Sequence, residues 1–335
     1  MTEAVIARVV ADSISPQGQR ITTFELEYPR IIHSELMTHR LFSRNAMSSR
    51  AIPIKKMIEQ VRDNPAMPVK FGKNQPGMQD AGDHVSPITE RVVDMDGTVK
   101  NVYHTPQDWY AKAGFLAAHF ASGFADAGYH KQIANRLLEP FQRMKTVLTA
   151  TDFENFWWLR VDKDADPTIF ALAETMKKAF DESEPEMLYP GMWHTPYVDH
   201  VYVNDDEFDG YCVLDEDNKP VMLTVEEAKA ISASCCAQVS YRVLNNTKDK
   251  ALDIYGKLLS GNKVHASPFE HQATPMEKVN LKDIYDQYWV DSNTEDFLCW
   301  EDGVTHLDKN GQLWSGNFCG WIQHRQLVPN NVVSG

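Results

Sequence analysis

The sequence has little of what several large protein classes require. It holds only five cysteines, an odd number without CxxC spacing, which suits neither a disulfide framework nor a zinc ribbon. No apolar run reaches the roughly 18 to 20 residues that a membrane helix needs. The first residues, MTEAVIARVVADS, have neither the charged segment nor the cleavage signal of a secretory leader. We therefore expect reduced cysteines, no membrane partner and a cytoplasmic protein.

Excess positive charge and glycine-rich phosphate loops are also missing. Acidic residues outnumber Lys and Arg by 47 to 33, for a formal net charge of −14. This balance opposes sequence-independent binding to phosphate backbones, so we expect no nucleic-acid partner. No GxGxxG follows a predicted strand and no GxxxxGK[ST] is present. Any local gathering of cations is therefore informative.

The predicted elements indicate an α+β fold. ITTFELEYP, residues 21–29, alternates apolar and polar side chains, as a half-buried strand does. Two capping boxes, Thr151 to Glu154 and Thr224 to Glu227, predict helix starts. Further helical patterns cover residues 29–42, 107–128, 130–141 and 167–180. Because strands and helices do not alternate regularly, we predict helices covering a small, mostly antiparallel sheet.

One short segment, THRLFSRNAMSSR at residues 38–50, contains three arginines and no acid. Charge-assisted hydrogen bonds contribute about 1.5 to 3 kcal/mol each, so two or three of them would hold one phosphate. The simpler alternative is a solvated basic loop that pairs with carboxylates of this acidic chain. The candidate donors are Arg40, Arg44, Arg50, Ser43, Ser48 and Ser49.

A second polar cluster is KVHASPFEH, at residues 263–271, where Pro268 fixes a turn. One interpretation is a polar wall around a ring-shaped ligand. A zinc site is the alternative, but His-x5-His lacks the helical i, i+4 spacing of HExxH, and we predict no metal. The polar residues of the cluster are His265, Ser267, Glu270 and His271.

Two arginines, Arg136 and Arg160, are embedded in apolar helical patterns, ANRLLEP and FENFWWLR. A buried guanidinium needs an anion or an acceptor to offset its desolvation. Pairing with Glu139 or Glu154 would be a purely structural solution. The functional interpretation is contact with an anionic ligand.

Together these clusters resemble the flavin-dependent thymidylate synthases, whose motif is RHRxxSxNxxSxR. HASPFEH is similar to that family's HxSPFEH, AQVSYR at 237–242 to its ARVSY, and NFWWLR to its NFxxLR. The order differs, because ARVSY and HxSPFEH precede RHR in the family and follow it here, as in a circular permutation. The RHR motif is represented here by Thr38, His39, Arg40, Ser43, Asn45, Ser48 and Arg50.

The resemblance implies a single catalytic domain, residues 1–335, of flavin-dependent thymidylate synthase type, with insertions at about 63–105 and 185–225. It implies an FAD-dependent methyltransferase that carries one carbon from methylenetetrahydrofolate to C5 of dUMP, giving dTMP, with NADPH as reductant. Such enzymes are usually homotetramers with shared sites. They use no cysteine nucleophile, which agrees with the scarcity of cysteine here.

The resemblance also implies roles for individual residues. An arginine opposite a pyrimidine carbonyl would stabilise the charge that develops on the ring. The catalytic residues would be Arg160 and Ser48. The nucleotide would be bound by Glu35, Ser48, Ser49, Arg50, Arg136 and Arg160. The flavin would be bound by His39, Arg40, Asn45, Asn155, Ser240, His265, Ser267 and Glu270.

Several positions depart from the family pattern. Thr38 replaces the first Arg of RHR, and Glu35 stands where a glutamine is usual. Thr149 and Thr151 stand where Asn and Arg are usual, which removes a cation that Lys131 or Arg143 would have to replace. The remaining departures are Ala46, Asp164 and Asp166.

These departures leave two alternatives open. A dUMP or dCMP hydroxymethylase would arise if water trapped the methylene intermediate, and Glu35 would then accept from the amino group of cytosine. A protein of another class, a non-catalytic nucleotide or single-strand binder, would stack bases on the eight tryptophans, although the net acidity opposes extended phosphate contacts.

Overall fold

The computed structural model describes residues 4–203, 207–215, 217–240, 247–260, 264–280 and 300–332. The side chain of Ser240 lies outside this set, so its predicted cofactor role is not placed. Among the described residues, no helix combines the length and the apolar composition needed to cross a bilayer.

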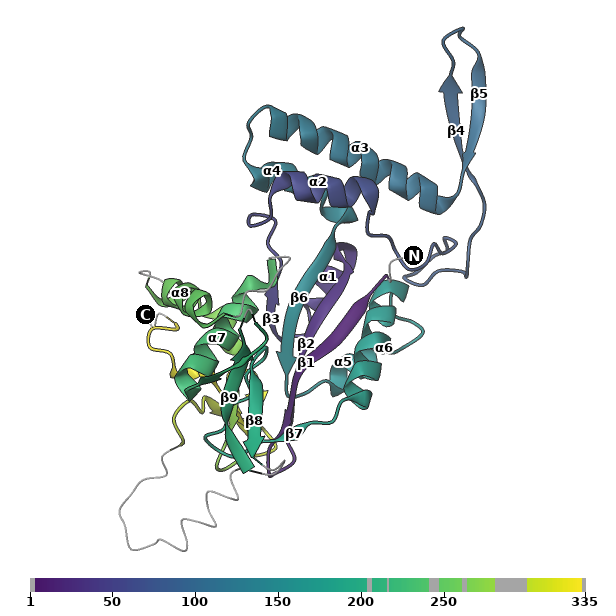
Figure 1. Cartoon of the computed structure of the whole chain (residues 1–335). Coiled ribbons are helices and arrows are strands. Elements are labelled where there is room, and N and C mark those ends of the chain that lie inside the picture. The colour runs from purple at the N-terminus through teal and green to yellow at the C-terminus, as the bar shows by residue number, and fades with distance from the viewer. Residues whose placement is uncertain are drawn as a thin grey trace, which may run out of the picture.

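A five-stranded sheet forms the centre of the molecule, in the order β3-β6-β2-β1-β7 (Figure 1). All neighbouring strands are antiparallel except β1 and β7. The mixed α+β class and the mostly antiparallel sheet are therefore confirmed. The strands are β1 (Ile6–Ile14), β2 (Arg20–Pro29), β3 (Ser43–Ala46), β6 (Arg143–Ala150) and β7 (Glu186–Met187).

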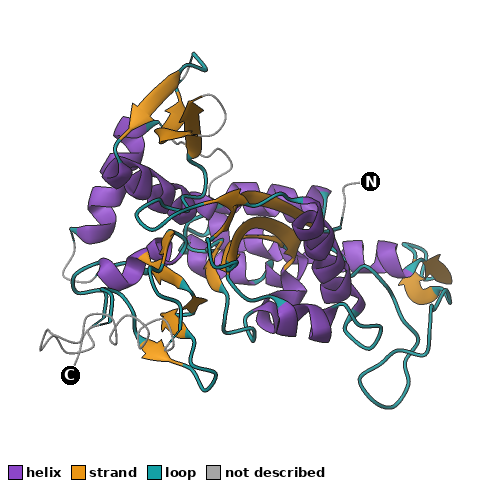
Figure 2. Ribbon diagram, turned by 90° about the horizontal axis from the view of Figure 1, so that it is seen from below, coloured by secondary structure: helices purple, strands orange, loops and turns teal. Residues whose placement is uncertain are grey.

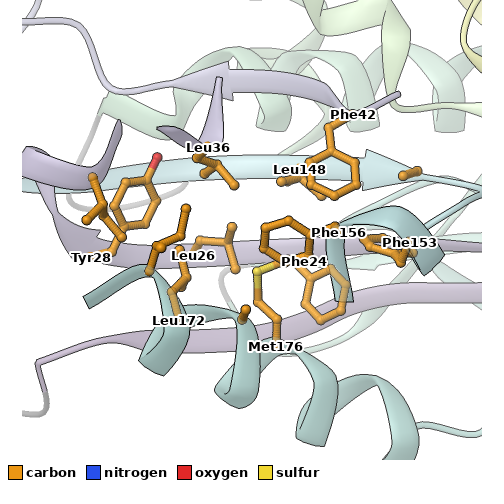
Figure 3. Packing of buried hydrophobic residues seen from close by; sticks show 14 of the residues in the cluster. Phe24, Leu26, Tyr28, Leu36, Phe42, Leu148, Phe153, Phe156, Leu172 and Met176 are labelled. Atoms are coloured by element: carbon orange, nitrogen blue, oxygen red, sulfur yellow. The ribbon is translucent and has the colours of Figure 1, made fainter. Parts of the chain in front are cut away.

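The first face of the sheet carries the main apolar core. Phe24, Leu26 and Tyr28 of β2 point to this face, as the alternation in the sequence predicts, and all three are fully buried (Figure 3). Burying side chains of this size contributes about 1.5 to 3 kcal/mol each. They pack against helices α1 (His33–Leu36), α5 (Glu154–Arg160) and α6 (Pro167–Glu182).

The second face of the sheet is closed by a buried chain of hydroxyl and imidazole groups. His194 contacts Ser13 through Nδ1 at 2.9 Å and Thr23 through Nε2 at 2.8 Å. The Thr23 and Thr149 hydroxyls are 2.7 Å apart, and Thr149 contacts His271 Nδ1 at 2.8 Å. Buried polar groups must be paired, so this chain fixes the second half of the sequence in register on the sheet.

The elements on this face come from the second half of the chain. Helix α7 (Val225–Ala237) and α8 (Lys248–Leu259) lie beside the sheet, with the short turns η3 (Gln238–Ser240) and η4 (Ser267–Glu270). A three-stranded sheet, β8 (Asp199–Val203), β9 (Glu207–Leu214) and β10 (Pro220–Leu223), packs on α7. The end of the chain adds β11 (Ala273–Pro275), β12 (His306–Leu307), β13 (Leu313–Ser315), β14 (Phe318–Cys319), β15 (Trp321–Gln323) and α10 (His324–Leu327).

A helical layer covers one end of the sheet. It consists of α2 (Ile54–Asp63), α3 (Pro106–Asp126) and α4 (Lys131–Arg136). The hairpin β4 (Ile88–Val93) and β5 (Val99–His104) projects away from the rest of the molecule in both views (Figures 1 and 2). The predicted insertion at 63–105 thus contains this hairpin, and that at 185–225 contains β7 to β10. Short helices η1 (Arg30–Ile32) and η2 (Glu139–Phe141) complete the fold.

Two local predictions are wrong and one is confirmed. The helix predicted to reach Phe42 ends at Leu36, because the Thr38 N–H and hydroxyl both donate to the Glu35 carbonyl and turn the chain. The Thr151 capping box does not form, since the Thr151 hydroxyl accepts from the Cys319 N–H and Phe153 is the N-cap. The box from Thr224 to Glu227 is present with both of its hydrogen bonds.

The buried imidazoles predict that stability falls in mild acid. Burial lowers the pKa values of His194 and His271 to about 3, so both are neutral in the folded state at pH 7. Between about pH 6.5 and 3 the unfolded chain binds more protons than the folded one. The free energy of unfolding should therefore decrease as the pH falls through this window, by up to about 1.4 kcal/mol per pH unit for each imidazole.

Urea unfolding at several pH values between about 7 and 5 would measure this slope. His271→Gln should reduce the slope, because it removes one of the two buried imidazoles. Equal slopes in the native chain and the His271 variant would contradict the prediction.

Candidate active site

The predicted nucleotide ligand Arg160 contacts His39 of the segment at 38–50 and Glu35 of the preceding helix α1. At the end of α5, its Nε donates to His39 Nε2 at 3.0 Å, and its Nη1 lies 3.1 Å from Glu35 Oε2. The pairing of Arg160 with Glu154 that the sequence allowed is replaced by the pairing with Glu35. The Arg160 side chain is 20% exposed and that of Glu35 is 39% exposed, so this group borders solvent.

His39 is held as a neutral ring. Its side chain is buried, stacked on Phe42 and edge-on to Phe156, with ring centroids 5.8 and 4.8 Å apart. Burial, with smaller effects from Arg160 and Arg44, lowers the pKa of His39 to about 4. A neutral imidazole that accepts at Nε2 carries its proton on Nδ1. The neutral His39 therefore accepts a hydrogen bond from Arg160 and orients its guanidinium without charge repulsion.

Arg44 is used inside the protein rather than as a phosphate fork. Its Nη1 donates to the carbonyls of Leu36 at 3.2 Å and His39 at 3.0 Å. Its positive charge helps to lower the pKa of His39. It also offsets part of the rise in the pKa of Glu270 that burial causes. Arg44 therefore lies within electrostatic range of both His39 and Glu270, the last residue of the turn at 267–270.

The turn η4 lies beside strand β3. Glu270 forms an ion pair with Arg325, and its pKa is raised by burial, an effect that hydrogen bonds to Arg325 and Ser43 and the charge of Arg44 partly offset. Gln323 Nε2 donates to the Glu270 carbonyl and to Ser43 Oγ, each at 3.3 Å. Arg325 and Gln323 could not be identified as site residues from the sequence, because neither belongs to a recognisable motif.

The predicted flavin ligand Asn45 is also occupied by the protein itself. Its side chain is 8% exposed, and Nδ2 donates to the Cys236 carbonyl at the end of α7 at 3.2 Å. Asn45 thus fastens β3 to α7. The segments at 43–50, 236–240 and 267–270, far apart in sequence, meet around this strand.

The predicted phosphate loop contacts α4. Asn135 Nδ2 donates to the Ser49 carbonyl at 2.7 Å, and the Arg50 N–H donates to Ser48 Oγ at 3.3 Å. The side chains of Arg50 and Arg136 are exposed and have no ion pair with a described residue; Glu139 pairs with Arg30 instead. This places Arg136 beside the loop, but no described contact joins either arginine to Arg160.

Four predicted flavin ligands are exposed to solvent. Within the described part of the chain, their side chains make no hydrogen bond or ion pair. They are Arg40, Asn155, His265 and Ser267. Arg40 adjoins His39 in sequence, and Asn155 lies at the other end of α5 from Arg160, but no described contact joins either side chain to the group formed by Glu35, His39 and Arg160.

The family departures have structural roles here. Thr149 belongs to the buried hydroxyl chain, Thr151 accepts from Cys319, and Thr38 ends α1. Asp166 caps α6 by accepting from the N–H groups of Thr168 and Ile169. Among the described residues, no group of three or more His, Cys, Asp or Glu side chains is placed to hold a metal ion.

Comparison with known proteins adds little. No family model matches the sequence, and no curated protein matches it. Among solved structures, the chain is similar to the UMP/dUMP methylase PolB from Streptomyces cacaoi bound with 5-Br UMP, with 16% identity and a TM-score of 0.37. The match covers 55% of this chain and 90% of the PolB chain. Similarity at this level is too low to transfer a fold family or a function.

The contact between Arg160 and His39 predicts a measurable change in titration. Arg160→Met removes a cation that opposes the imidazolium, so the pKa of His39 should rise from about 4 toward its ordinary value. NMR titration of the His39 ring would follow this shift. Arg50→Met, which removes an exposed arginine of the same motif, should leave the His39 pKa unchanged. An unshifted His39 in the Arg160 variant would contradict the described contact.

Proposed function

We propose that the chain is an enzyme that transfers a one-carbon unit to C5 of a pyrimidine deoxynucleotide monophosphate. One observation carries the proposal: Glu35, His39 and Arg160 converge in space, although more than a hundred residues separate Arg160 from the other two. These are the positions to which the family resemblance assigns ring and flavin contacts. A purely structural ion pair would need only Glu35 and Arg160, whereas here a neutral histidine also orients the arginine.

Arg160 suits the electrostatic demand of such a reaction. Attack by C5 on an electrophile places negative charge on the pyrimidine carbonyl oxygens, which a partly desolvated cation stabilises strongly. Nε and Nη1 are fixed by His39 and Glu35, which leaves Nη2 without a partner among the described residues. A guanidinium fixed on one side presents its remaining N–H groups in a defined direction.

The residues present fit a flavin in part. Arg40, Asn155, His265 and Ser267 offer exposed donors, and a dinucleotide cofactor carries phosphates and ring carbonyls that accept them. Asn45 and Glu270 already have partners within the chain. We propose that the four exposed residues hold FAD and that Asn45 and Glu270 position β3 and η4 beside it.

The co-substrates follow from the same proposal. Methylenetetrahydrofolate would supply the carbon and NADPH the reducing equivalents, with dTMP as the product of methyl transfer. Bound FAD would supply the redox chemistry. The chain itself would bind and orient the nucleotide, with Arg160 acting on the ring and Ser48, Ser49 and Arg50 directed at the phosphate.

Glu35 favours a second candidate, a deoxycytidylate or deoxyuridylate hydroxymethylase. A carboxylate beside Arg160 accepts hydrogen bonds but cannot donate them. Cytosine offers an amino donor there, whereas uracil offers a carbonyl that a carboxylate repels. Capture of the methylene intermediate by water instead of hydride would then give a hydroxymethyl product.

The exposed surface around Arg136 supports a homo-oligomer. An apolar face runs over α3 and α4, with Phe115, Leu116, Phe120, Ile133 and Leu137 between 40% and 62% exposed. Contiguous apolar surface of this kind marks interaction sites. We propose that another copy of the chain covers it, as in a homotetramer with shared sites, and that Arg136 completes the phosphate contacts of a neighbouring subunit.

A mass measurement tests the reaction. Purified protein is incubated with FAD, NADPH, methylenetetrahydrofolate and either dUMP or dCMP. A methyl gain on dUMP supports thymidylate synthesis, and a hydroxymethyl gain supports the second candidate. Nucleotide binding without any product would indicate the non-catalytic binder.

Arg160→Met should lower the rate of product formation by about a hundredfold or more, since it removes the charge opposite the ring. Arg62→Met, an exposed arginine of α2 paired with its neighbour Asp63, is the matched control and should retain activity. Equal activity in both variants would contradict the role of Arg160.

The interface has its own test. Phe120→Glu places a charge in the apolar face and should shift the protein toward a smaller species in light scattering, with loss of activity. Met95→Glu, at a more exposed apolar residue at the tip of the β4–β5 hairpin, should change neither. A native chain that is monomeric and fully active would contradict the shared site.

A further inference from the structure

A cavity of about 360 Å³ lies between α2 and the second face of the sheet. Glu27 of β2 and Arg143 and Lys145 of β6 contribute its sheet side, and Lys56 and Met57 contribute its helix side. None of the residues assigned above to nucleotide or flavin binding lines it. It adjoins the phosphate loop, because the residues just before and after Ser48–Arg50 form part of its wall.

The cavity concentrates positive charge in a chain that is strongly acidic. Among the described residues that line the cavity, three are cations, Lys56, Arg143 and Lys145, and one is a carboxylate, Glu27. Glu27 lies 3.9 Å from Arg143 Nη1, at the limit of an ion pair. Lys56 and Lys145 have no ion pair with a described residue. Like charges that share a cavity repel each other, and a bound anion would offset this repulsion.

Most of the remaining wall is apolar. Met47, Ile52 and Met57 line the cavity with the cations, and Met57 belongs to the core beneath α2. Flexible methionines adapt to flat aromatic rings, and the volume is in the range of about 300 to 1,000 Å³ typical of small-molecule sites. The lining therefore suits a ligand with a planar apolar body and an anionic group.

The start of α2 at the cavity rim adds to the attraction for an anion. Pro53 is the N-cap of this ten-residue helix and provides no side-chain hydrogen bond to its first turn. The unsatisfied N–H groups and the helix dipole favour negative charge there. This contribution supplements the two lysines, on which the inference rests.

We propose that this cavity is a binding site for a phosphate monoester carried on a planar aromatic ring, with Lys56 and Lys145 as the phosphate ligands and the methionines against the ring. Arg143 and Glu27 form the adjoining polar edge. The site is defined by different residues from the group at Arg160, and the proposal does not depend on any reaction at Arg160.

Calorimetric titration of the full chain with dUMP, deoxyuridine and inorganic phosphate tests the site. The nucleotide should bind more tightly than either fragment. Lys56→Gln and Lys145→Gln should each weaken dUMP binding by about three- to tenfold, as partly exposed charge pairs do. Lys55→Gln, the neighbouring exposed lysine of α2 that does not line the cavity, is the matched control and should bind as the native chain does.

Arg160→Met separates this proposal from the proposed function. If Lys56→Gln and Lys145→Gln weaken dUMP binding, the cavity site is supported, whether or not Arg160→Met also weakens it. If only Arg160→Met weakens binding, the cavity proposal is overturned and the proposed function stands. Lack of binding of every probe to the native chain would overturn the cavity proposal. Unchanged thermal unfolding of each variant would confirm that the binding changes are local.

Discussion

The pairing of β3 with the edge of β6 is the constraint on which the candidate site depends. Adjacent residues of a strand point to opposite faces, so four residues of β3 serve two layers at once. Ser43 and Asn45 reach η4 and α7 on the second face, while Arg44 reaches the end of α1 on the first. A shift of one residue in register would exchange these contacts and separate the two halves of the site.

The electrostatics of the site follow from burial as much as from charge. Two arginines lie near His39, and the neutral state of that ring lets it accept from Arg160 instead of repelling it. Glu35 and Glu270 supply the compensating negative charge, one toward solvent and one toward Arg325. Each cation is thereby fixed before a ligand arrives, so little reorganisation is needed when charge develops on a bound ring.

Features with a local physical cause could be predicted from sequence, and those that depend on distant partners could not. The alternation at 21–29 and the capping box at Thr224 needed only neighbouring residues, and both are present. The Thr151 box failed because Cys319, 168 residues away, takes its hydroxyl. The resemblance singled out His39 and Arg160 as functional residues. Their contact, and the role of Arg325, required the fold.

Strand β6 shows where the second face of the sheet can carry positive charge. Its alternate residues Lys145, Val147 and Thr149 face the same side of the sheet. At Thr149 that side is closed by the buried hydroxyl and imidazole chain, where an unpaired cation would pay a large desolvation penalty. At Lys145, four residues earlier, the same side opens into the cavity beneath α2 and reaches solvent. On this face of β6, positive charge is therefore found at the open end, where Arg143 and Lys145 lie.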